Sequence, residues 1–165
     1  MDFDKYGALL KRLSDRELAK IEKKIMQRMG ITFLKMIRDE LKRQGLTDSK
    51  KTLQSFMKGK RGNVWKLDKD RNTFTLEVGS WWYIARFLDE GYEIKNPHFV
   101  PGYFSGSKFV YEGYGKAIGV KRGVIMKPRT FIGRHYIDIA LEGFQGGMVA
   151  LIDRLFEKEL KKVIG

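Results

Sequence analysis

The chain has 165 residues, which as a prior corresponds to one domain with a substantial buried core. It contains no cysteine, and this excludes a disulfide scaffold, thiol catalysis and a zinc site built on sulfur. The 33 Lys and Arg residues outnumber the 20 Asp and Glu residues and give a net charge of +13, so nucleic acid, a membrane surface or an acidic protein are the partners to consider.

A long amphipathic helix is predicted over residues 15–44. Ser14 and Glu17 have the spacing of a capping box, and apolar residues then recur every three or four positions as one stripe. Gly45 tolerates the left-handed conformation that ends helices. At about 1.5 Å per residue such a helix spans about 45 Å, more than the width of a small domain. We therefore expect it to kink near Gly30 or to project toward a neighbouring subunit.

The remaining pattern predicts several shorter elements. Two short helices are expected over residues 3–13 and 81–88, the second packing its aromatic residues onto a sheet, and strands over residues 53–60, 64–68, 73–78 and 118–126. Two C-terminal helices are expected over residues 133–141 and 148–163, separated by the glycine-containing segment 143–147. The order of elements indicates an α+β fold over residues 1–165, in which a small, mainly antiparallel sheet is packed by the long N-terminal helix and the C-terminal helices.

Residues 92–127 differ in composition from the rest of the chain. Six of these 36 residues are glycine and seven are aromatic. Glycine favours mobility, whereas exposed aromatic side chains need a surface that covers them. Two interpretations remain open: a loop that becomes ordered against a partner, and a glycine-kinked hairpin on the same sheet. Either makes Tyr103, Phe104 and Tyr111 candidate assembly contacts.

The sequence shows no pattern typical of an enzyme. His98 and His135 are far apart and have no carboxylate at metal-ligand spacing. Residues 105–107 lack the spacing of a nucleophile elbow, and residues 58–62 lack that of a phosphate-binding loop. We expect no catalytic residue, no metal and no cofactor. With no apolar run near the roughly 18 residues of a membrane span, and an acidic start unlike a signal peptide, we also expect an intracellular product and no membrane partner.

The positive charge is concentrated in the first third of the chain. Residues 1–62 hold 17 basic and 8 acidic residues. Their acid-free clusters supply the candidate phosphate contacts Lys50, Lys51, Lys58, Lys60 and Arg61. Since no zinc-finger, basic-zipper or RNP pattern accompanies them, any DNA contact is expected to be non-specific in sequence.

Three short motifs follow one another along the chain. Residues 47–56 read Thr-Asp-Ser-Lys-Lys-Thr-Leu-Gln-Ser-Phe, residues 78–91 contain Val-Gly-Ser, Tyr-Ile-Ala and Asp-Glu-Gly, and residues 127–132 read Lys-Pro-Arg-Thr-Phe-Ile. In this order and spacing they resemble the tail-component family of long-tailed bacteriophages, proteins thought to complete the tail and join it to the head. Similar proteins occur in contractile-tailed phages and in phage-derived bacteriocin particles.

This resemblance implies a structural protein of a virion or phage-like particle, present in the host cytoplasm during assembly. It implies a ring of identical subunits, a hexamer that matches the symmetry of the tail tube, with the tail tube or terminator and neck or connector proteins as partners. Arg129, Asp89 and Glu90 are its candidate assembly contacts, and Phe131 is expected to anchor the C-terminal helix on the sheet. The rival interpretation is a basic, non-sequence-specific DNA-binding module.

Overall fold

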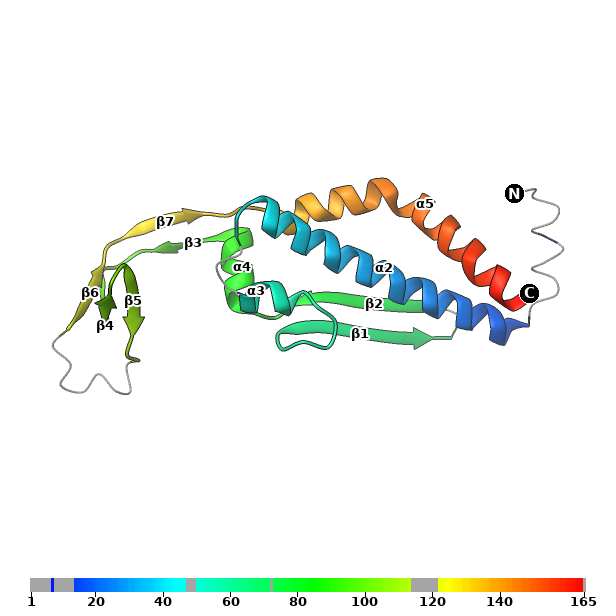
Figure 1. Cartoon of the computed structure of the whole chain (residues 1–165), viewed down its shortest axis with the longest axis horizontal. Helices are drawn as coiled ribbons and strands as arrows, with labels where there is room; N and C mark the ends of the chain where they lie inside the picture. The colour runs from blue at the N-terminus through cyan, green and yellow to red at the C-terminus, as the bar shows by residue number, and fades with distance from the viewer. Residues whose placement is uncertain (1–6, 8–13, 47–49, 72, 114–121, 165) are drawn as a thin grey trace. The chain divides into compact units, whose positions relative to one another are not determined.

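The computed structural model describes residues 7, 14–46, 50–71, 73–113 and 122–164 (Figure 1). The chain divides into two compact units: unit 1 comprises Met1–Asp89 and His135–Gly165, and unit 2 comprises Glu90–Arg134. Both helices and antiparallel strands are present, so the predicted α+β class is confirmed. The predicted helix over residues 3–13 lies outside the described residues, apart from the helical Gly7, as do residues 118–121 of a predicted strand.

Unit 1 is built on the long helix α2 (Asp15–Arg43), whose predicted start and end are confirmed. The Glu17 backbone N–H donates to the Ser14 hydroxyl, and the Ser14 N–H donates to the Glu17 carboxylate over 3.0 Å, which completes the capping box. Gly45 follows with a φ of +70°. The helix is continuous through Gly30, where it packs so closely on the hairpin of residues 63–80 that a Cβ would lie 2.6 Å from Leu76 Cδ2.

The strand predicted over residues 53–60 is wrong. Residues Lys50–Ser55 form helix α3, and a turn leads from it into the hairpin of β1 (Asn63–Asp70) and β2 (Thr73–Ser80). Burial explains the difference, since Thr52 and Ser55 are buried at the three-residue spacing of a helix. The turn contains Gly59 with a φ of +76°, which a continuing strand would not accommodate. Both hairpin strands, and helix α4 (Tyr83–Glu90), were predicted.

The C-terminal residues form one helix, α5 (Tyr136–Ile164), instead of the two predicted. Glycine weakens an isolated helix by about 1 kcal/mol relative to alanine, but packing against a neighbouring helix outweighs such a local preference. Helix α5 packs along α2, where a Cβ at Gly143 would meet the Met36 side chain at 3.3 Å. In Figure 1, α2 lies between α5 and the β1–β2 hairpin.

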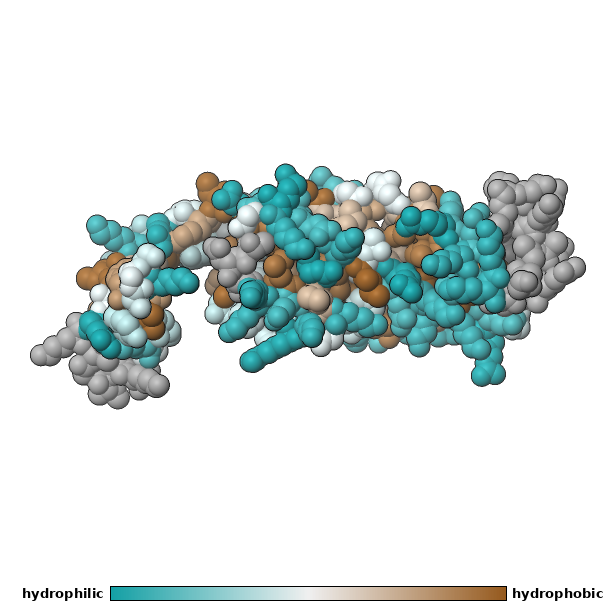
Figure 2. Space-filling view, in the orientation of Figure 1, coloured by the Kyte–Doolittle hydropathy of each residue, from teal (hydrophilic) through white to brown (hydrophobic). Residues whose placement is uncertain are grey.

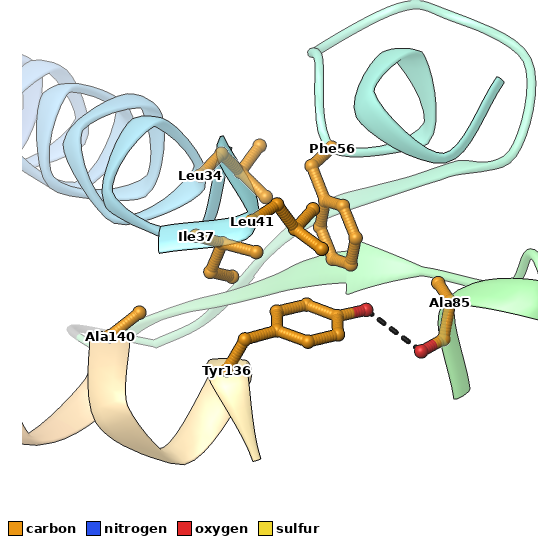
Figure 3. Close-up of a cluster of buried hydrophobic side chains, with 7 residues drawn as sticks. All are labelled: Leu34, Ile37, Leu41, Phe56, Ala85, Tyr136 and Ala140. Carbon is orange, nitrogen blue, oxygen red and sulfur yellow. Dashed lines mark hydrogen bonds between the residues drawn. The ribbon is translucent and has the colours of Figure 1, made fainter. Parts of the chain in front are cut away.

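Two clusters of apolar side chains form the core of unit 1. The larger cluster joins α2, the turn after α3, α4 and α5, and its buried members are Leu34, Ile37, Leu41, Phe56, Ala85, Tyr136 and Ala140 (Figure 3). Within it, the rings of Phe56 and Tyr136 meet edge to face at 6.0 Å. The smaller cluster joins Ile21 and Ile25 of α2 to Leu160 of α5. The apolar stripe predicted for the long helix is therefore the face that packs.

The described residues of unit 2 form two small antiparallel sheets. Strands β3 (Gly91–Ile94) and β7 (Arg129–Ile132) form one, and strands β5 (Lys108–Tyr111), β4 (His98–Ser105) and β6 (Gly123–Met126) form the other in that order. The described part of residues 92–127 contains paired strands, as the hairpin interpretation predicts, but these strands form sheets of their own instead of extending the sheet of β1 and β2. Ordering of this segment against a partner stays a prediction.

The expected position of Phe131 is wrong. This residue belongs to β7, and its ring stacks on Tyr92 of β3 with 4.2 Å between the centroids. The pairing of Tyr92 with Phe131 across the two strands produces this contact. Phe131 therefore contributes to unit 2, and the anchor of the C-terminal helix in the core is Tyr136.

Candidate interaction surfaces

A small network of polar contacts holds the basic turn between α3 and β1 against the start of α4. The Ser80 hydroxyl donates to the Ser55 hydroxyl over 2.8 Å and accepts from the Trp82 backbone N–H over 3.0 Å. The Asn63 side-chain amide donates to the backbone carbonyls of Ser55 and Gly79. These contacts join α3, both hairpin strands and the residue before α4, so neighbours within unit 1 hold the turn in place.

The five predicted phosphate contacts lie on this one segment. Lys50 and Lys51 begin α3, whereas Lys58, Lys60 and Arg61 lie in the turn, and all five side chains are exposed. The Lys58 ammonium lies 4.2 Å from the centre of the Trp65 ring, which gives it a partner within the chain. The arrangement supplies a positive surface of five exposed basic residues along one segment.

An aromatic surface adjoins the basic turn. Trp81, Tyr83 and Phe87 are 60%, 59% and 43% exposed, and the rings of Tyr83 and Phe87 meet edge to face at 5.8 Å. The Trp81 backbone N–H donates to the Gly62 carbonyl over 3.0 Å, which brings this surface next to Arg61.

The expectation that residues 81–88 pack their aromatic side chains inward is therefore wrong, except for Trp82, which packs against the core. The buried Ala85 and Asp89 determine which face of α4 points inward. Tyr83 and Phe87 lie four residues apart, on the helix face opposite Ala85 and Asp89. This spacing is the signal in the sequence that could have located the aromatic surface.

Asp89, one of the candidate assembly contacts, lies on the inner face of α4. It is buried, its backbone carbonyl accepts from the His135 N–H over 3.0 Å, and its carboxylate accepts from the Ile137 N–H over 2.9 Å. The carboxylate thus caps the N-terminus of α5, where negative charge is stabilising. Burial, and secondarily the charge of Asp89, raise the pKa of the Tyr136 phenol. Glu90 is exposed at the end of α4.

Unit 2 carries the other predicted assembly contacts. Tyr103 has the Arg122 guanidinium 4.4 Å from its ring centre, and Arg122 also pairs with Glu112. Phe104 meets Phe109 edge to face, and both Phe104 and Tyr111 are exposed.

Arg129 is exposed on β7, and its guanidinium lies 4.3 Å from the centre of the Phe131 ring. Stacking of this kind holds the charge in place while leaving its polar edge open to a partner. The structure thus places Arg129 on unit 2 and Asp89 within unit 1.

Possible metal ligands and the two histidines were also located in the structure. In the described ranges, no three His, Asp or Glu side chains come together as metal ligands would. The ring of His98 lies near the Asn96 carbonyl, and His135 lies 3.7 Å from the Asp138 carboxylate, so the two histidines have different partners. A shallow groove of about 770 Å³ near the start of α2 is lined by charged groups of both signs, among them Lys20 and Asp68.

The distribution of hydrophobic surface is visible in Figure 2. Hydrophilic side chains cover most of the face of unit 1 shown there around the start of α2 and the end of α5, and hydrophobic residues reach the surface nearer the other end of α2. Among the helices that the structure describes, none has the length and apolar character needed to cross a membrane.

Comparisons with known proteins point to a phage-derived origin. The chain is 31% identical over 138 residues to the phage-like element PBSX protein XkdI of Bacillus subtilis (strain 168), an alignment that covers 82% of this chain and 76% of XkdI. It is 27% identical over 167 aligned positions to the uncharacterized protein YqbI of the same organism, covering 98% of this chain and 94% of YqbI. No protein-family model matches the chain. No solved structure matches it either.

Proposed function

The chain belongs to the family of the phage-like element PBSX protein XkdI, and on this premise we propose that it is a structural protein that completes the tail of a phage or phage-like particle. In this proposal a ring of identical subunits, a hexamer on the tail tube, joins the tail to the head or neck. The observation that carries the proposal is the similarity to XkdI over 82% of the chain. The place in the tail is supported by the three sequence motifs in residues 47–56, 78–91 and 127–132.

The exposed surfaces agree with a role in protein contact. Aromatic residues and arginine are enriched where proteins bind one another, and both are exposed on each unit. Trp81 and Tyr83 lie on unit 1, whereas Phe104 and Arg129 lie on unit 2. We infer that the protein acts by binding neighbouring tail, terminator, neck or connector proteins and that it catalyses no reaction. Before assembly it would reside in the host cytoplasm.

The proposal is tested by locating the protein in purified particles. We expect an antibody or a C-terminal tag to label one end of the tail, at the position where the head or neck is attached. A host that lacks the gene should accumulate separate tails and heads, and plasmid-borne protein should restore joined particles. Labelling along the capsid, or absence of the protein from purified particles, would contradict the proposal.

A DNA-binding role is the second candidate, and the exposed basic segment from Lys50 to Arg61 favours it. When a protein binds DNA through its phosphates, the logarithm of the affinity falls linearly with the logarithm of the salt concentration. The slope is set by the number of phosphates that the protein neutralises. The triple variant Lys58→Ser, Lys60→Ser, Arg61→Ser should reduce that slope if the turn contacts DNA. Equal slopes for the variant and the parent protein would remove the turn from any DNA interface.

A further inference from the structure

The first observation concerns the exposed face of α4 and the turn beside it, which we call the basic–aromatic surface and define as Lys60, Arg61, Trp81, Tyr83 and Phe87. Three large aromatic side chains are exposed here. Lys60 and Arg61 are also exposed, and they belong to the turn that the backbone hydrogen bond from Trp81 to the Gly62 carbonyl holds beside Trp81. A patch that combines aromatic area with arginine and lysine fits a partner that is apolar and acidic.

The second observation concerns the first half of α5. Residues 136–153 contain no Lys or Arg, although the whole chain carries a net charge of +13. Their acidic residues Asp138, Glu142 and Asp153 are exposed. Exposed apolar side chains lie among them, including Leu141 and Val149, the latter 69% exposed. We call this the acidic–apolar surface, and it has the chemistry that the basic–aromatic surface requires.

The two surfaces point away from the core that lies between them. Ala85 and Asp89 form the inner face of α4, and Tyr136 and Ala140 form the inner face of the first turns of α5. The hydrogen bond from the Tyr136 hydroxyl to the Ala85 carbonyl holds these inner faces together (Figure 3). Because each outer face is turned away from this contact, the two surfaces of one chain do not cover each other.

We propose that the partner of the basic–aromatic surface is a second copy of this chain, which presents its acidic–apolar surface. Since two different surfaces meet, the contact is heterologous, and repeating it produces either a closed ring or a filament. That the repeated contact closes into a ring, and does not form a filament, rests on the proposed function. The head-to-tail contact itself depends only on the charge and apolar complementarity of two faces of unit 1.

Cross-linking tests the proposed neighbours directly. The chain has no cysteine, so introduced cysteines are its only thiols. The double variant Phe87→Cys, Leu141→Cys, treated with a short bismaleimide at a protein concentration where self-association is measured, should give a ladder of dimers, trimers and larger species on a denaturing gel. Each single variant should remain monomeric on the gel. A dimer from either single variant would show a symmetric contact, and no ladder from the double variant would show that the surfaces do not meet; both overturn the inference.

Charge reversal gives an independent test in solution. Lys60→Glu, Arg61→Glu alters one surface, and Asp138→Lys, Glu142→Lys alters the other, all at exposed positions where folding is expected to persist. Each pair should weaken self-association more than about tenfold by sedimentation. An equimolar mixture of the two pairs should associate again, because one variant then has two acidic faces and the other has two basic faces, so each contact joins one variant to the other. All four changes in one chain should also restore self-association. Unchanged association in both pairs overturns the inference.

The outcomes separate this inference from the proposed function. A protein that is labelled at the tail end, yet is monomeric at its highest soluble concentration and insensitive to these changes, would overturn the head-to-tail contact and leave the tail role standing. A protein that forms the ladder and is absent from particles would overturn the tail role and leave the contact standing. Circular dichroism of each variant, which should match that of the parent chain, shows whether the fold is retained.

Discussion

The hydroxyl of Tyr136 donates a hydrogen bond to the backbone carbonyl of Ala85 over 2.8 Å, and so joins the start of α5 to α4 across 51 residues of sequence. Both residues are buried, and the ring of Tyr136 also fills the space beside Phe56. Three segments that are distant in the chain therefore meet at one side chain, which makes this position sensitive to small changes.

Tyr136→Phe should lower the free energy of unfolding by about 1–2 kcal/mol, because the ring still packs while the buried Ala85 carbonyl loses its donor. Tyr136→Ala should cost about 3–5 kcal/mol, since it also leaves a cavity. Urea denaturation midpoints measure both. A Phe variant as stable as the parent would show that water or another donor replaces the phenol.

Gly30→Val should destabilise the protein by about 1–3 kcal/mol, because the added Cβ would lie 2.6 Å from Leu76 Cδ2 and 3.0 Å from the Trp65 ring. Gly146→Val on α5 is the matched control. Apart from its chain neighbours and the backbone of its own helix, no described atom lies within 4 Å of its Cβ position, and valine is a better helix former than glycine by roughly 0.3 kcal/mol, so this change should be nearly neutral. Thermal melts compare the two, and equal effects would contradict the close packing of α2 on the hairpin.

Asp89→Ala should cost about 0.5–2 kcal/mol through loss of the cap on α5, and Asp89→Asn, which keeps an acceptor oxygen, should cost less. Amide hydrogen exchange gives the local readout: the Ile137 N–H should exchange faster in the Ala variant. Glu90→Ala, at the neighbouring exposed position, is the control and should leave that rate unchanged. Unaltered exchange at Ile137 in the Asp89→Ala variant would contradict the capping role.

Because of Glu159, the free energy of unfolding of unit 1 should decrease as the pH falls into the acid range. Its hydrogen bonds with Lys162 and then with Lys24 of α2 hold the pKa of this carboxyl below its ordinary value. A carboxyl whose pKa is lower in the folded state stabilises the fold at pH values above its unfolded-state pKa of about 4.3. This stabilisation is lost as the pH falls through the lower, folded-state pKa.

Glu159→Gln should therefore be less stable than the parent at pH 7, and the difference should shrink as the pH is lowered below about 4. Denaturant titrations at several pH values between 7 and 3 measure it. Glu157→Gln, two residues earlier on the same helix, is the control. A difference between parent and Glu159→Gln that stays constant over this pH range would show that the ion pair between α2 and α5 is not the cause.

Three of the corrected predictions share one property: contacts with residues far along the chain decide the outcome. Helix α3 replaces a predicted strand because Thr52 and Ser55 turn toward the core and the hairpin. Helix α5 continues through its glycines because α2 packs alongside it. Phe131 lies in unit 2 because β7 pairs with β3, an arrangement that no local pattern in residues 127–132 specifies.

The sequence by itself determined the features that depend on neighbours a few residues apart. The capping box of Ser14 and Glu17, the end of α2 at Gly45 and the alternation in β2 are such features, because turns, caps and side-chain periodicity are local. Only the tertiary structure decided which side chains remain exposed. Trp81, Tyr83 and Phe87 form a surface because Ala85 and Asp89 are drawn inward by Tyr136 and by the N-terminus of α5, and those contacts exist only once the chain has folded.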